Sequence, residues 1–130
     1  MSYYFSTVIK NRSFEEAKEL IGSQLQTEGF GVLTEIDMQG TFKKKLGVDF
    51  KKYTILGACN PQLANKALKE EDKLGVLLPC SIVIEQDEPG TVEVSFVDPI
   101  ASLGNVENDE VFKIAKEVQQ KLKKVMQTLS

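Results

Sequence analysis

The amino-acid sequence predicts an α+β domain: a single-layer mixed or antiparallel sheet of about five strands with helices packed on it. Stretches rich in β-branched and aromatic residues alternate with segments of helical periodicity, in the order β-α-β-(short α)-β-α-β-β-α. Some strands are separated by helices and others by short turns, which favours this layering. With 130 residues the chain is long enough to bury its own core, so we expect one domain over residues 1–130.

The first strand and helix are predicted at the N-terminal end of the chain. Residues 3–9 read YYFSTVI, which is aromatic and β-branched as strands usually are. Ser13 and Glu16 then have the spacing of a capping box, which marks a helix start. Apolar residues follow at helical spacing, and Gly29 is a typical residue just after a helix. We therefore expect a helix over residues 13–28 with one buried face.

Two strands flanking a short helix are expected next. Residues 31–38 alternate between apolar and more polar side chains, which predicts a strand with one exposed face. Phe42 and Leu46, four residues apart among lysines, predict a short amphipathic helix that ends at Gly47. These lysines either contact an anionic partner or, as we prefer, form a solvated face. Residues 53–59, YTILGAC, predict a strand buried on both sides. The lysine-rich segment has few apolar anchors and is expected to be the most mobile internal segment.

A second helix is expected to begin at Asn60-Pro61, because Asn is a favoured N-cap residue and Pro is favoured at the first helical position. Residues 74–86 are interpreted as a long strand region with a bulge, edge or bend at Pro79. The sequence DEPG at residues 87–90 predicts a turn, so the strand that follows it should complete a hairpin.

The last helix is predicted from about Asp109 to Thr128, and its apolar residues have the spacing of a coiled-coil seam. These seam residues are Val111, Ala115, Val118, Leu122, Val125 and Leu129. Phe112, Ile114 and Met126 lie off the seam and widen the apolar surface, and the aromatic first strand offers a second apolar surface. We therefore expect a homodimer, since closed twofold dimers are the commonest oligomers.

Composition narrows the classes of function. The 16 basic and 19 acidic residues give a net charge of −3, which speaks against a nucleic-acid partner. The N-terminus lacks the charge and apolar run of a signal peptide, and no apolar run is long enough to cross a membrane. We therefore expect a cytoplasmic protein without a membrane partner.

The chain has no histidine, which removes the commonest general base and the commonest metal ligand. This absence excludes Ser-His-Asp and Cys-His catalysis in their usual forms. It also excludes HExxH motifs and Cys2His2 zinc sites. The GxGxxG motif of nucleotide binding is also absent. No cofactor is predicted, and a non-enzymatic role is favoured.

Cys59 and Cys80 are the only cysteines, and each follows an apolar run near a proline. We predict that they lie close together at the ends or bends of neighbouring strands. Buried structural thiols are the simplest interpretation, because free cysteine is often a small buried hydrophobe. A ligand-binding or redox role is the alternative, since the helix expected after Cys59 could favour its thiolate. A thiolate metal site is a third interpretation, although two thiols alone cannot complete a tetrahedral zinc site.

Several segments together resemble the DUF302 family over nearly the whole chain. They are IDMQGTFKKKLGVDFKKYTILGACNPQLANKAL, LGVLLPCSIVI, VSFVDP and the long final helix. The resemblance implies a compact α+β domain, cytoplasmic in a form this short, with no established activity. It marks Gly57, Cys59, Asn60, Pro61, Pro79, Cys80, Asp98 and Pro99. Ser81 stands where many relatives carry Asn.

Two hypotheses of function follow. The first is a small-molecule-binding or interaction domain with a pocket near the two cysteines, in which Cys59, Asn60, Cys80 and Asp98 are the candidate ligand-binding residues. For Asp98, a purely structural role in capping the following turn is preferred. The second is a thiol-based redox or thiolate metal-binding protein that uses Cys59 and Cys80.

Overall fold

The computed structural model describes residues 2–130 and has the predicted α+β architecture. Five strands form one antiparallel sheet in the order β1-β5-β4-β3-β2. The strands are β1 (Tyr4–Lys10), β2 (Gly31–Asp37), β3 (Lys52–Cys59), β4 (Cys80–Glu88) and β5 (Thr91–Val97). The helices are α1 (Phe14–Thr27), α2 (Met38–Leu46), α3 (Pro61–Glu70), the short α4 (Pro99–Ser102), α5 (Asp109–Gln127) and the 3-10 helix η1 (Asp72–Leu77).

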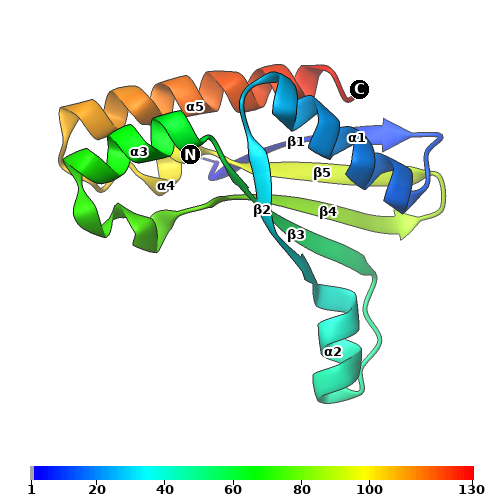
Figure 1. Ribbon diagram of the computed structural model, residues 1–130. Helices are drawn as coiled ribbons and strands as arrows, with labels where there is room; N and C mark the ends of the chain where they lie inside the picture. Colours follow the sequence, from blue (N-terminus) through cyan, green and yellow to red (C-terminus); the bar gives the residue numbers. More distant parts are fainter. Residues whose placement is uncertain (1) are drawn as a thin grey trace.

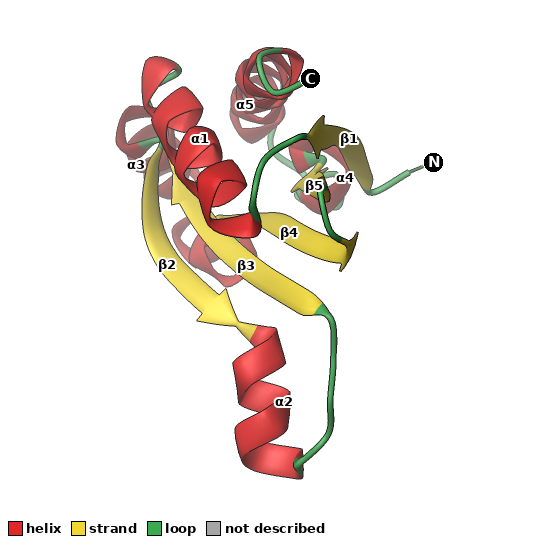
Figure 2. Ribbon diagram, turned by 90° about the vertical axis from the view of Figure 1, so that its right-hand side faces the viewer, coloured by secondary structure: helices red, strands yellow, loops and turns green. Residues whose placement is uncertain are grey.

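The helices are distributed unequally over the two faces of the sheet. Helices α1, α3 and α5 lie on one face, and α5 packs against both of the others (Figure 1). Helix α2 instead projects from the opposite side, where it stands away from the rest of the molecule (Figure 2). The sheet therefore has one face covered by a helical layer and one face that is largely open.

The helix starts follow the local signals in the sequence. Ser13 Oγ accepts a hydrogen bond from Glu16 N at 3.1 Å, and Glu16 Oε1 accepts one from Ser13 N at 2.8 Å, which is a complete capping box. Gly29, with φ of 84°, turns the chain after α1. Asn60 Oδ1 accepts a hydrogen bond from Leu63 N at 3.3 Å and so caps α3.

The seam of α5 is buried within this one chain. All six seam residues are at most 9 % exposed, and they pack against the sheet, α1, α3 and α4. Burial of each Val or Leu side chain stabilises the fold by roughly 1.5–3 kcal/mol. Ile114 and Met126 are partly buried against the same core, whereas Phe112 is 48 % exposed. The helix thus offers little apolar surface to a second copy.

The region before β4 differs from the predicted long strand. Residues 72–77 form η1, the Leu78–Pro79 peptide bond is cis, and the strand begins only at Cys80. Leu74 is buried in a cluster with residues of α3 and α5. Of this apolar run Leu74 packs against helices, whereas Val76 and Leu77 are 83 % and 43 % exposed, so its apolar composition does not mark a strand.

Strand β2 also differs from its predicted pattern, because no residue of it is buried and Met38 already belongs to α2. It is an edge strand with a register shift between Val32 and Thr34. Beyond the shift, Glu35 lies on the helical side, where Lys18 Nζ contacts it at 2.7 Å, and Ile36 is exposed. A bulge reverses the alternation of faces, so a regular two-residue pattern could not predict burial here.

Strand β3 was expected to be buried on both sides, but this holds only near its C-terminal end. Leu56, Gly57 and Ala58 are buried, whereas Tyr53 and Ile55 are half-buried. The reason is that the open face of the sheet leaves alternate residues in contact with solvent.

Candidate functional site

An apolar pocket lies at the end of the sheet where β3 stops and β4 starts. Its volume is about 270 Å³, and α3, η1, α4 and α5 contribute to its walls. It lies between two clusters of buried apolar residues, one under α1 and the sheet and one among α3, α4 and α5. Its apolar lining includes Leu63, Ala67, Leu74, Leu103, Ile114 and Val118.

Cys59 and Cys80 both line this pocket. Cys59 is the last residue of β3, and Cys80, the first of β4, pairs with Ala58 in the sheet. The structure thus brings the two thiols together at the ends of neighbouring strands, as the sequence indicated. Both are free thiols and both are half-buried.

The environment of the two thiols favours their protonated form. Burial raises the pKa of Cys80 to about 11, and the neighbouring Cys59 adds to this increase. Burial also raises the pKa of Cys59, although α3 begins just after it. Desolvation favours the neutral thiol over the thiolate at both positions. At neutral pH the pocket presents two uncharged thiols.

Asn60 joins two helices at the pocket wall. Its side-chain carbonyl caps α3, and its Nδ2 donates a hydrogen bond to Glu28 O, just after α1, at 3.2 Å. Both ends of the amide are therefore engaged in holding the backbone. Asn60 positions the wall formed by α3 and leaves the pocket with little hydrogen-bonding capacity of its own.

Asp98 is not among the residues that line the pocket. Its Oδ1 accepts hydrogen bonds from Ile100 N and Gln119 Nε2, each at 3.0 Å, and its own N–H donates to Tyr3 O at 2.8 Å. These contacts cap α4 and tie it to α5 and to the start of β1. The carboxylate therefore has a structural role, while Pro99 after it reaches the pocket lining.

Gly57 allows a close approach of two segments beside the pocket. A Cβ atom at this position would lie 2.7 Å from Pro79 Cγ and would also collide with Thr34 Oγ1. Because only glycine lacks this atom, β2, β3 and the segment before β4 can pack together here.

Several lining residues were not predicted as part of a site. Leu74, Leu78, Leu103 and Pro99 come from η1, the following loop and the α4 region. A signal for α4 was present, since Asp98-Pro99 has the same cap-then-proline pattern as Asn60-Pro61. The convergence of these segments is a tertiary feature that no local pattern encodes.

Among residues 2–130, no three His, Cys, Asp or Glu side chains are grouped so that they could hold a metal ion. No helix in the described part of the chain combines the length and the apolar character needed to cross a bilayer.

Comparisons with known proteins place this geometry in a family. The family model for DUF302, a domain of unknown function, matches residues 5–129. The chain is also similar to an uncharacterised conserved DUF302 protein from Bacillus stearothermophilus, known from a crystal structure. The TM-score is 0.90 at 27 % sequence identity, and the match covers 100 % of both chains. A comparison with curated proteins found no match.

Proposed function

Since the chain belongs to the DUF302 family, a domain of unknown function, we propose a function from its pocket: binding of a small, neutral and mostly apolar molecule. We place the protein among binding domains rather than enzymes. The residues that enclose the ligand come from α3, η1, α4, α5 and the paired ends of β3 and β4.

The observation that carries this proposal is an apolar pocket of about 270 Å³ that is partly open to solvent, with Leu33 and Leu68 of its lining exposed. Water leaves such an apolar surface when an apolar molecule covers it, which favours binding. A cavity of about 150 Å³ is enough to hold benzene. The volume here therefore fits a ligand larger than one aromatic ring.

The chemistry of the lining defines the class of ligand. Its side chains are apolar apart from two thiols and Asn60, whose amide already has two backbone partners. A charged ligand would lose its hydration without gaining a partner, which costs several kcal/mol. The proposal is therefore restricted to uncharged molecules.

A thiol-based role is the second candidate, and the adjacency of Cys59 and Cys80 is what favours it. It ranks second because redox attack and metal binding both need thiolates, and the raised pKa of each cysteine disfavours them. A metal site would also need ligands from beyond the two cysteines.

Thermal denaturation with chemically matched probes tests the binding proposal. Indole and 1-octanol are the neutral probes, and octanoate is the charged counterpart of the second. At 100 times its dissociation constant, a bound probe would stabilise the fold by about 2.7 kcal/mol and raise the Tm by several degrees. We expect this with the neutral probes and not with octanoate.

Ala64→Leu is the matched control variant, because Ala64 lines the pocket on α3 and a larger side chain there would occupy it. The variant should lose the probe-dependent shift while it remains folded. An unchanged Tm of the natural chain with both neutral probes would contradict the proposal, and so would an equal shift in the variant.

We also propose a compartment and an oligomeric state. Two free cysteines suit a reducing compartment, so we propose the cytoplasm. We also propose a homodimer, but the burial of the α5 seam means that its interface must lie elsewhere.

A further inference from the structure

Residues 38–51, called here the α2 arm, carry apolar side chains of which none is buried within residues 2–130. Helix α2 has no buried residue, and Leu46 is 68 % exposed. Val48 and Phe50, which follow the helix, are 46 % and 40 % exposed. Isolated helices shorter than about 12–15 residues are marginal in water. A nine-residue helix that projects from the molecule therefore gains most from an external contact (Figure 1).

The face of the sheet opposite the helical layer has a hollow that matches this need. We call its lining the open sheet face: Tyr3, Tyr4, Tyr53, Ser81, Val83, Glu85, Glu93, Ser95, Phe96 and Val97. Tyr3 and Tyr4 are 72 % and 45 % exposed. Exposed apolar surface with a polar rim is typical of an interaction site. Their rings lie 5.0 Å apart and leave much of each side chain open to solvent.

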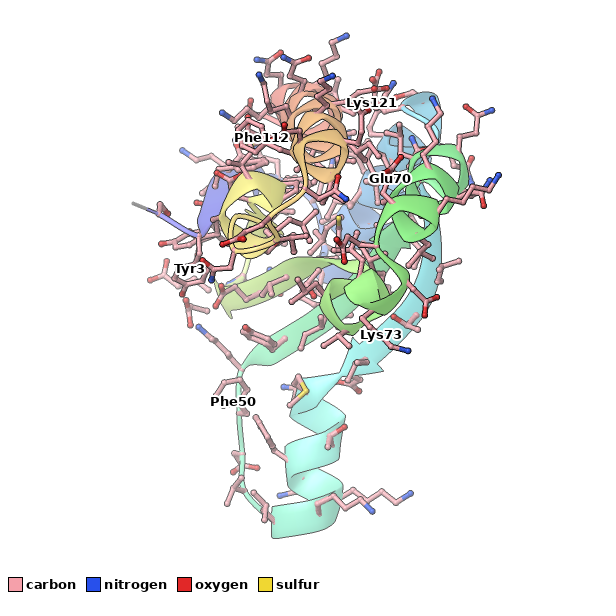
Figure 3. The ribbon with its side chains drawn as sticks, turned by 90° about the vertical axis from the view of Figure 1, so that its left-hand side faces the viewer. Tyr3, Phe50, Glu70, Lys73, Phe112 and Lys121 are labelled. Atoms are coloured by element: carbon pink, nitrogen blue, oxygen red, sulfur yellow. The ribbon has the colours of Figure 1, made fainter. Side chains whose placement is uncertain are left out.

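The arm and the open sheet face are continuous. The rings of Phe42 and Phe50 are 5.1 Å apart, and those of Phe50 and Tyr53 are 5.8 Å apart. At the base of the arm, Lys51 Nζ lies 2.6 Å from Glu85 Oε1. Figure 3 shows Phe50 on the segment between α2 and the sheet, with Tyr3 at the edge of the sheet above it. One aromatic surface thus runs from the arm to the hollow.

The two surfaces have opposite charge. Glu85 and Glu93 are direct cross-strand partners, an arrangement in which like charges destabilise the sheet. Lys51 pairs with Glu85, whereas Glu93 has no salt bridge within residues 2–130. Lys44 and Lys45, at the end of α2, also have no salt bridge within residues 2–130. Positive charge at the tip of the arm therefore complements negative charge on the open sheet face.

We propose that two copies of this chain form a twofold dimer in which each α2 arm lies across the open sheet face of the other copy. The apolar residues of the arm contact the tyrosines, and Lys44 and Lys45 lie near Glu93. Each chain carries both complementary surfaces, so a twofold arrangement uses both pairs and closes the assembly. This interface is independent of the ligand pocket on the other side of the sheet.

Sedimentation equilibrium across the micromolar range tests the interface. We expect a mass of twice 14.5 kDa for the natural chain. Leu46→Asp, at a position that is exposed in the single chain, should raise the dissociation constant at least about 100-fold, because it places a charge in an apolar contact. Phe112→Asp on α5 is the control of comparable exposure and should remain dimeric.

A charge exchange tests the pairing itself. Glu93→Lys should weaken the dimer about tenfold or more, and adding Lys44→Glu and Lys45→Glu to the same chain should restore it. Circular dichroism checks that each variant is folded. A monomeric natural chain would overturn the proposal. A dimer broken by Phe112→Asp but not by Leu46→Asp would overturn it in favour of the helical face.

Discussion

The Cys80 thiol should remain protonated well above neutral pH, because burial raises its pKa to about 11. Its alkylation should therefore be slow at pH 8 and accelerate toward pH 11. The unfolded thiol loses its proton near the ordinary value of 9.0, so between these values the unfolded chain binds fewer protons than the folded one. The free energy of unfolding should then fall, by roughly 2 kcal/mol, as pH rises from about 9 to about 11.

Cys80→Ala separates this effect from the titration of lysines and tyrosines. Its unfolding free energy, measured by urea denaturation at several pH values, should fall less steeply over the same range. Equal slopes for the variant and the natural chain would contradict a raised pKa at Cys80.

Gly57 gives a second prediction at this scale. Gly57→Ala would place a Cβ atom 2.7 Å from Pro79 Cγ and against Thr34 Oγ1, so we expect a destabilisation of roughly 1–3 kcal/mol. Gly22→Ala is the control, because that helical position has no neighbouring atom within 4 Å and should gain up to about 1 kcal/mol. Chemical denaturation of both variants provides the comparison, and similar effects of the two would refute the steric argument.

Individual residues of the candidate site were partly predictable from the sequence. Cys59 and Cys80 end apolar runs, and Asn60 precedes a proline, so these features located one end of the sheet. Asp98 was also a candidate, but its carboxylate caps α4 and bonds Gln119. A strand-end aspartate has the same sequence context in either role, and only its partners distinguish them.

At the scale of elements, Asn60 is predicted to stabilise α3 by two separable contacts. Asn60→Ala removes both the helix cap and the bond to Glu28 O, and should cost about 1–3 kcal/mol. Asn60→Ser keeps a cap acceptor but loses the amide donor, so its loss should be smaller. Unfolding free energies measure the difference. If serine were as destabilising as alanine, the cap would not contribute.

Elements with local signals were the ones that the sequence predicted well. The capping box of Ser13 and Glu16 marked α1, and Asn60-Pro61 marked α3. The apolar run before Pro79 resembled a strand because local composition cannot show whether its partner is a strand or a helix. Edge strand β2 kept an alternating pattern in sequence, yet none of its residues is buried.

The α2 arm leads to a prediction about local stability. In the monomeric Leu46→Asp variant, amides of residues 39–52 should exchange faster than those of residues 76–97, because α2 buries no side chain whereas β4 and β5 pair on both sides. In the natural chain at high concentration the arm should be slower than in the variant. Hydrogen exchange with peptide resolution measures both, and equal rates in the two segments of the variant would contradict the prediction.

At the scale of the whole molecule, two buried clusters meet at the pocket. One joins α1, the sheet and the C-terminal part of α5, and the other joins α3, η1, α4 and the N-terminal part of α5. Ile114 packs against both. The long α5 thus bridges the clusters along one side and leaves the cavity between them. The sequence predicted the two faces of α5 but not this division, which depends on where α4 and η1 settle.

Thermal stability should depend on protein concentration if the α2 arm joins two copies. Association stabilises only the folded state, so dilution favours unfolding by mass action. For two chains of 130 residues that unfold together, the expected unfolding enthalpy gives a rise in Tm of about 3 °C for each tenfold increase in concentration. Leu46→Asp should show a Tm that does not change with concentration, whereas Phe112→Asp on the helical face should keep the dependence of the natural chain. Differential scanning calorimetry over a hundredfold range measures all three proteins. A flat response in the natural chain would mean that the arm remains uncovered, and a slope retained by Leu46→Asp would place the contact on another surface.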